Sequence, residues 1–114
     1  MVSTDWTESF PLNTQTINTV VTKTSSGAYA LGRQIGYAFY VDYVGRSDTD
    51  LAVRLKFWIG RYTHFQAGYY GSPLDAFIKE CNLYHDFAGS LDNKVHPDRP
   101  NNSGWKCPRC YNFA

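Results

Sequence analysis

Residues 27–46 read GAYALGRQIGYAFYVDYVGR, a run that contains two strand patterns and the turn between them. From Tyr37 to Gly45, aromatic or apolar side chains fall at every second position, which is the period of a strand with two different faces. The residues ahead of Gly36 read as a shorter strand, and glycine supplies the turn. We therefore expect an antiparallel hairpin centred near Gly36, in which Tyr29 lies opposite Tyr43 on one side of the sheet.

Two helices and a third strand follow this hairpin. Residues 50–59 carry apolar side chains at helical spacing, and Gly60 ends the pattern. Residues 63–70 alternate again and are expected to form a strand. Ser72 then begins a helix, with proline in its first turn, that runs to about Phe87. This order predicts an α+β fold with a small three-stranded antiparallel sheet flanked by helices.

Length and composition indicate a single domain. A chain of 114 residues with 43% hydrophobic and 17% aromatic residues can bury one core. We divide it into a polar lead segment (1–26), a core (27–93) and a C-terminal tail (94–114). The mean hydropathy of −0.42 and the lack of a long apolar run argue against a membrane-spanning helix. Residues 1–7 show no basic stretch leading into an apolar one, so we expect a cytoplasmic protein without a secretory signal or a membrane partner.

The charges are nearly balanced overall, with a net charge of +1, but they are unevenly distributed. Residues 33–66 hold five basic and three acidic side chains, and residues 94–110 hold four basic and one acidic. Such cationic segments suit contacts with phosphate groups, although ordinary solvated charge gives the same pattern. The distribution is compatible with a nucleic-acid partner and does not by itself require one.

Four side chains in and after the hairpin could take part in a single reaction: Tyr29, Tyr43, Arg54 and Glu80. A carboxylate can hold a divalent metal, a guanidinium can stabilise an anionic transition state, and a phenol can relay or accept a proton. Together these groups suit the cutting of a phosphodiester. Each of them alone has an ordinary structural explanation, as a packed ring or a solvated charge, so the inference depends on the whole set.

The set and its surroundings resemble the GIY-YIG nuclease family over residues 27–93. Gly27-Ala28-Tyr29 matches the first tripeptide of that family and Tyr43-Val44-Gly45 matches the second. Arg54 matches the arginine of the helix that follows, and Glu80 matches the metal-binding glutamate. The resemblance implies a divalent-metal-dependent endonuclease that hydrolyses phosphodiester bonds in DNA, with the α+β fold expected above.

The resemblance also implies a role for each residue of the set. Glu80 would hold one Mg²⁺ or Mn²⁺ ion at the scissile phosphate. Tyr29 or Tyr43 would help to deprotonate the attacking water. Arg54 would stabilise the charge that develops on the phosphate, and Arg46 would assist it, because some members carry a lysine at that position.

The chain also departs from the family pattern. Thirteen residues separate the two tripeptides, more than is usual in the family, and Ala28 replaces an isoleucine. Trp58 stands where several members have a histidine, so that role is lost or passes to His64. Asn93 lies where many members place an asparagine of the site. The alternatives are a nucleic-acid-binding module that has lost cleavage, which Trp58 favours, and a zinc-stabilised interaction protein.

A second group of side chains predicts a structural metal site. Cys81 and His85 are four residues apart on one face of the second expected helix, and a C-P-R-C motif supplies Cys107 and Cys110. Three sulfurs and one nitrogen make a closed tetrahedral set typical of structural zinc, whereas a disulfide would leave one of the three cysteines over. His96 is the alternative nitrogen ligand. Zinc at this site would hold the tail against the second helix.

Overall fold

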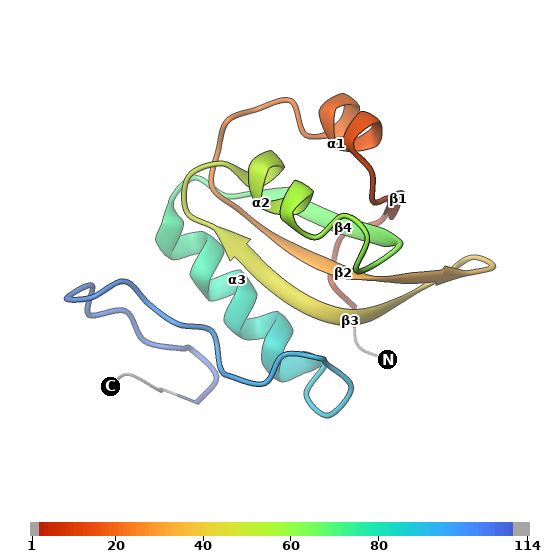
Figure 1. The fold of residues 1–114 in the computed structure, drawn as a ribbon. Helices are drawn as coiled ribbons and strands as arrows, with labels where there is room; N and C mark the ends of the chain where they lie inside the picture. The colour runs from red at the N-terminus through yellow and green to blue at the C-terminus, as the bar shows by residue number, and fades with distance from the viewer. Residues whose placement is uncertain (1–2, 111–114) are drawn as a thin grey trace.

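The computed structural model describes residues 3–110 of the chain, and these residues contain four strands and three helices. Residues 1–2 and 111–114, at the outer ends of the lead segment and the tail, lie outside this part. In chain order (Figure 1), the elements are β1 (Phe10–Pro11), α1 (Thr14–Val20), β2 (Gly27–Ile35), β3 (Ala38–Ser47), α2 (Leu51–Phe57), β4 (His64–Tyr69) and α3 (Pro73–Asp86).

The strands form one antiparallel sheet in the order β1-β4-β2-β3. The α+β class expected from the sequence is confirmed, but the sheet has four strands rather than three. The additional strand is β1, in which Phe10 pairs with Phe65 and Pro11 pairs with His64. A two-residue strand is too short to show a period in the sequence, because its pairing depends on contacts with residues far along the chain.

The hairpin of β2 and β3 has a different register from the one expected. Its two-residue loop begins at Gly36, whose φ of 61° lies in the left-handed region that favours glycine. An irregularity after Leu31 then shifts the pairing, so that Tyr29 lies opposite Gly45 and Leu31 lies opposite Tyr43. The prediction that the two tyrosines lie directly opposite was therefore wrong. Because side chains alternate along a strand, Tyr43 still shares the face of Tyr29, displaced by two residues.

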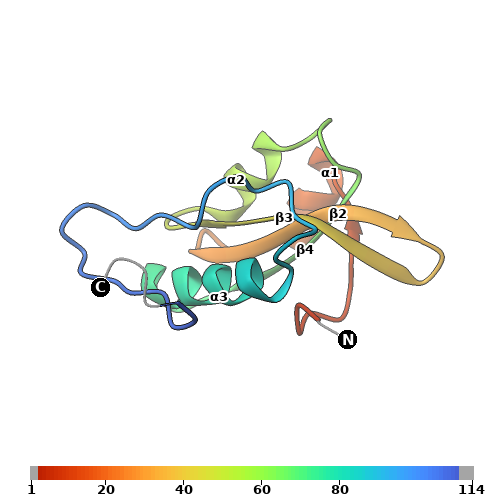
Figure 2. The ribbon, with the colours of Figure 1, turned by 90° about the horizontal axis from the view of Figure 1, so that it is seen from below.

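Helices cover both faces of the sheet. In Figures 1 and 2, α1 and α2 lie on one face and α3 lies on the other. The strand β2 is therefore buried at every position from Gly27 to Gly32. The largest core cluster fills the side of α1 and α2 and includes Ile17, Leu31, Leu51, Leu55 and Phe65. A smaller cluster on the opposite side joins Ala30 and Val44 of the sheet to Leu83 of α3.

Local signals account for the helix starts. Asn13 caps α1 and Asp50 caps α2, each through a side-chain oxygen that accepts a backbone N–H three residues later. Ser72 caps α3 in the same way, with proline as the first helical residue, so the helix expected from this signal is confirmed. None of the helices within residues 3–110 combines the length and apolar character needed to cross a bilayer.

Candidate active-site groove and metal centre

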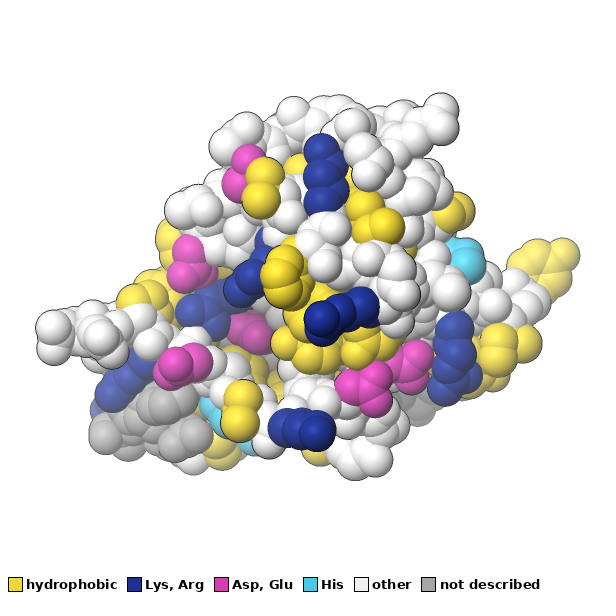
Figure 3. Space-filling view, in the orientation of Figure 1, with side chains coloured by type: hydrophobic (Ala, Val, Ile, Leu, Met, Phe, Trp, Pro, Cys, Tyr) yellow, Lys and Arg dark blue, Asp and Glu magenta, His cyan; other side chains and the backbone are white. Residues whose placement is uncertain are grey.

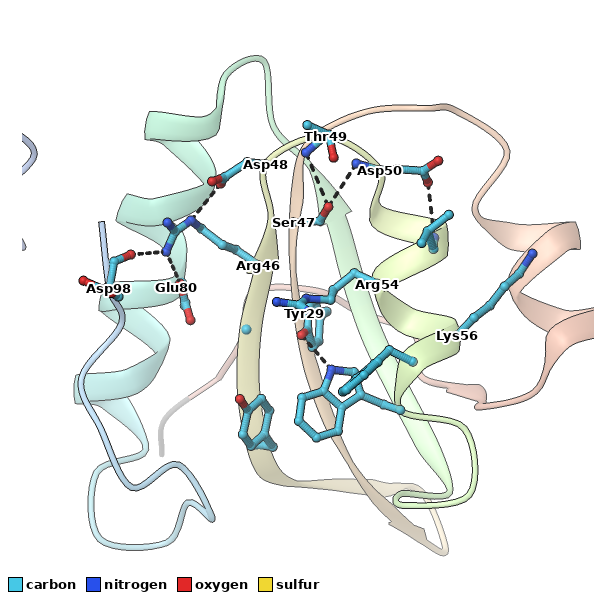
Figure 4. Close-up of a pocket in the computed structure, with 15 residues that line it drawn as sticks. Tyr29, Arg46, Ser47, Asp48, Thr49, Asp50, Arg54, Lys56, Glu80 and Asp98 are labelled. Atoms are coloured by element: carbon cyan, nitrogen blue, oxygen red, sulfur yellow. Dashed lines mark hydrogen bonds and ion pairs between the residues drawn. The ribbon is translucent and has the colours of Figure 1, made fainter. Parts of the chain in front are cut away.

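An open groove of about 930 Å³ lies between α2 and α3, at the C-terminal end of β3 (Figure 4). Strands β2 and β3 form its floor, and the tail contributes Asp98 to one wall. Four of the residues expected to form a site, Tyr29, Tyr43, Arg54 and Glu80, all line this groove. Arg46 and Trp58 line it as well. The sheet, both neighbouring helices and the tail thus bring together residues far apart in the sequence.

Tyr29 lies on the floor of the groove and is almost completely buried. Its ring crosses Gly45 of the opposing strand so closely that a methyl group at position 45 would overlap the phenol. The indole N–H of Trp58 donates a hydrogen bond of 2.8 Å to the Tyr29 oxygen. Burial raises the pKa of Tyr29, against the lowering effect of this hydrogen bond, so the phenol stays protonated at neutral pH.

Tyr43 is half-buried beside Tyr29 and packs on Trp58, with a ring-centroid distance of 4.5 Å. Burial raises its pKa, and the negative charge of Glu80 raises it further. The positive charge of Arg54 acts to lower the pKa of Tyr43 and of Tyr29. Neither tyrosine is therefore a ready base at neutral pH. Both are suited to orient a water molecule or a phosphate oxygen through hydrogen bonds.

Arg54 extends from α2 toward Tyr29 across the mouth of the groove (Figure 4). Its side chain is exposed, and the ion pairs found within residues 3–110 do not include it. A guanidinium in the same groove as the two phenols, with no carboxylate partner, can take a phosphate oxygen without first breaking an ion pair.

Glu80 faces the groove from α3 and is only 8% exposed. Burial raises the pKa of this carboxyl to about 7, although Arg46 acts in the opposite direction. Arg46 Nη1 donates to Glu80 Oε1 at 2.9 Å. The second carboxylate oxygen, Oε2, takes no part in the hydrogen bonds described for residues 3–110. A hard oxygen ligand of this kind fits Mg²⁺ or Mn²⁺.

Arg46 is the most extensively contacted cation of the groove. Besides Glu80, it binds Asp48 at 2.8 Å and the backbone carbonyl oxygen of Asp98 at 2.6 Å. Its guanidinium also lies 5.1 Å from the ring centre of Phe77 and 5.8 Å from that of Trp105. The sequence led us to expect a residue that assists Arg54 at the phosphate. The structure places Arg46 against the carboxylate that was expected to hold the metal.

Two other residues expected in the site lie outside it. His64 belongs to β4, pairs with Gly32 and contacts the hydroxyl of Thr63, and it is not among the residues that line the groove. Asn93 uses both ends of its amide on the backbone of Val44, with two hydrogen bonds of 2.9 Å. The amide of Asn93 therefore has a structural partner, and Trp58, rather than His64, occupies the position beside Tyr29.

The tail and α3 together form a possible metal centre. One ligand atom from each of His85, His96, Cys107 and Cys110 lies within 4.8 Å of the others. The set expected from the sequence contained Cys81 instead of His96, and this part of the prediction was wrong. Cys81 is fully buried and packs in a core cluster with Phe77 and Cys107, because its face of α3 turns toward the interior. His96, the alternative ligand, joins His85 in the cluster.

The donor chemistry of this cluster fits a metal such as zinc. Nε2 of His85 is buried without a hydrogen-bond partner within residues 3–110, which is unfavourable unless another group binds it. Burial acts to raise the pKa of the Cys107 thiol, but hydrogen bonds from the N–H groups of Arg109 and Cys110, together with those from the side chains of His96 and Cys110, lower the pKa to about 6. A thiolate at neutral pH is a metal ligand, and two nitrogens with two sulfurs make a tetrahedral zinc set.

Sequence reasoning ranked one member of these sites wrongly and missed two others. His96 was named only as the alternative to His85, although its position, eleven residues beyond His85 and eleven before Cys107, was the available signal for the fourth ligand. Phe57 and Lys56 also line the groove, and their signal was a basic residue two positions and an aromatic residue three positions after Arg54. Comparison with protein-family models, curated proteins and solved structures finds no match to this chain.

Proposed function

We propose that the groove hydrolyses phosphodiester bonds in DNA and that Glu80 holds the divalent cation this reaction uses. The observation that carries the proposal is the convergence of Tyr29, Tyr43, Arg54 and Glu80 on one open groove. Four different elements supply these side chains, so their meeting is not a result of sequence proximity. The resemblance to the GIY-YIG family implies the same residues.

In this proposal the side chains of the groove divide the work of hydrolysis. Arg54 binds a non-bridging oxygen of the phosphate and offsets the charge that develops there. The two phenols hold the attacking water in line by hydrogen bonds, with Tyr29 fixed in place by Trp58. Mg²⁺ or Mn²⁺, when bound by Glu80, would supply Lewis-acid activation of the phosphate. The oxygen of water bonds to phosphorus as the bond to the leaving oxygen breaks; the proton that the attacking water loses passes to bulk water, and the leaving oxygen takes a proton from bulk water.

For the tail, we propose a structural zinc ion held by His85, His96, Cys107 and Cys110. Four protein ligands leave no position open for water, so this metal would stabilise rather than react. Its ligands come from α3 and from three points of an irregular segment that has little regular structure of its own. Binding of zinc would therefore contribute to the folding of the tail.

A binding module without cleavage is the second candidate. It is favoured by the Arg46–Glu80 ion pair, since Arg46 occupies one of the oxygens that a metal would use. Incubation of the purified protein with supercoiled plasmid distinguishes a nuclease from a binding module. With Mg²⁺ or Mn²⁺ we expect nicked and linear DNA, and we expect neither with Glu80→Gln. Binding without nicking in either metal would support the module, and absence of DNA binding would support a zinc-stabilised interaction protein.

A further inference from the structure

An aromatic ring and three cations are grouped on α2 and on the loop that follows it, at the lip of the groove. Phe57 ends α2 and is 60% exposed, whereas Phe65 and Phe77 are fully buried. Arg54, Lys56 and Arg61 surround it in the sequence. We call these four residues the aromatic–cationic lip. Figure 3 shows dark-blue cationic side chains lying against yellow hydrophobic ones on the face that carries α2.

The two arginines of the lip lie against the ring of Phe57 rather than against carboxylates. The guanidinium carbon of Arg54 is 5.6 Å from the ring centre of Phe57, and that of Arg61 is 5.9 Å from it. Arg61 also lies 5.6 Å from the ring centre of Trp58. The ion pairs described for residues 3–110 include neither arginine, nor Lys56. The positive charge of the lip is therefore unneutralised by the protein.

Three carboxylates of the groove, those of Asp48, Asp50 and Glu80, take part in contacts with other groups. Arg46 is paired with Asp48 and Glu80 inside the groove. Asp50 accepts the backbone N–H of Val53 and so acts as the cap of α2. Arg54, Phe57 and Arg61 are exposed to solvent, and Lys56 and Phe57 lie on the wall of the groove.

From this arrangement we infer that the lip binds an unpaired stretch of DNA, with a base stacked on Phe57 and the flanking phosphates held by Arg54, Lys56 and Arg61. Aromatic rings combined with cations are the usual means of holding single strands, because every unpaired base offers a flat face. In a duplex these faces are covered by neighbouring base pairs. The inference names the form of the substrate and in that respect rests on the proposed function.

The position of Arg54 connects the lip with the floor of the groove. The same Arg54 side chain that lies against Phe57 extends toward Tyr29 (Figure 4) and lines one groove with Tyr29 and Tyr43. A strand that stacks one base on Phe57 therefore brings an adjacent phosphate to the phenols. This would direct cleavage to single-stranded or locally unpaired DNA.

Fluorescence anisotropy without added Mg²⁺ or Mn²⁺ measures binding apart from cleavage. The probes are a labelled oligothymidylate of about twelve nucleotides, within the site sizes of single-strand binders, and a duplex of the same length. We expect tighter binding of the single strand. Phe57→Ala should weaken that binding by about tenfold, as the loss of one stacked base predicts. Phe57→Leu, which keeps an apolar side chain without a flat ring, should weaken it as well.

The matched control is Tyr37→Ala, because Tyr37 is fully exposed at the hairpin tip, away from the groove. It should leave the affinity unchanged. Full affinity of Phe57→Ala or Phe57→Leu, equal or tighter binding of the duplex, or no binding of the single strand would each overturn the inference. A protein that binds the single strand through Phe57 but never nicks DNA would retain the inference and lose the proposed nuclease.

Discussion

The indole N–H of Trp58 donates a 2.8 Å hydrogen bond to the phenol oxygen of Tyr29 on the floor of the groove. This bond crosses from the C-terminal end of α2 to the central strand of the sheet. It satisfies an oxygen that burial would otherwise leave without a donor, and it fixes the direction of the phenol. Trp58 departs from the GIY-YIG pattern, in which several members have a histidine at this position. It nevertheless orients Tyr29, one of the two tyrosines that match the pattern.

Trp58→Phe should lower the free energy of unfolding by about 1–2 kcal/mol, because the buried oxygen of Tyr29 loses its donor while most ring packing remains. Urea denaturation measures the change. The double variant Trp58→Phe, Tyr29→Phe removes both partners and should recover part of the loss. If Trp58→Phe is as stable as the wild type, the hydrogen bond contributes nothing.

Gly45→Ala should destabilise the protein by about 1–3 kcal/mol, since the added methyl group overlaps the Tyr29 ring and the core cannot easily move. The matched control is Gly71→Ala, where a methyl group meets no atom within 4 Å. Denaturation curves for the two variants give the comparison. Equal stabilities would contradict the close approach of Tyr29 to position 45.

The raised pKa of Glu80 predicts that the free energy of unfolding depends on pH. This pKa is about 7 in the folded protein, against about 4.3 in an unfolded chain. Between these values the unfolded chain has released a proton that the folded protein keeps, so the free energy of unfolding falls as pH rises. The favourable contribution is complete below the unfolded pKa and is lost at about pH 7.

Denaturation of the zinc-loaded protein across this pH range tests the effect. Glu80→Gln should flatten the curve relative to the wild type. Asp75→Asn removes an exposed carboxyl from the same helix and should leave the shape unchanged. A wild-type curve that matches that of Glu80→Gln would show that Glu80 titrates normally.

Two variants distinguish the ligand set in the structure from the set expected from sequence. Elemental analysis should find one zinc per chain in the wild type and in Cys81→Ala, because Cys81 lies outside the cluster of His85, His96, Cys107 and Cys110. His96→Ala should lose the metal and loosen the tail. Retention of zinc by His96→Ala together with its loss from Cys81→Ala would restore the earlier assignment.

Local patterns in the sequence were sufficient for much of the fold. Alternation in the hairpin and the Ser72 cap predicted two strands and α3, because strand period and capping involve only neighbouring residues. The strand β1 and the register of the hairpin were not predictable in this way. The first depends on pairing with β4, and the second on an irregularity at Leu31 that has no fixed sequence signature.

The candidate site shows the same division. The positions of Tyr29 and Glu80 in one groove could be inferred from the order of motifs. The Arg46–Glu80 pair could not, because Asp98 and Trp105, which hold Arg46, come from an irregular tail more than fifty residues away. Helical spacing also placed Cys81 and His85 on one side of α3, but it could not tell which of them joins the metal cluster.

The contact between Asn93 and Val44 affects whether two molecules of this protein can associate through the edges of their sheets. Val44 belongs to β3, the strand with no neighbour on its outer side within the described sheet. There Asn93 bonds both backbone groups of Val44, and the N–H of Asp92 bonds the carbonyl of Asp42 at 2.6 Å. These backbone groups are no longer available to a strand from another molecule. The segment that contains Asp92 and Asn93 therefore hinders edge-to-edge aggregation of the sheet.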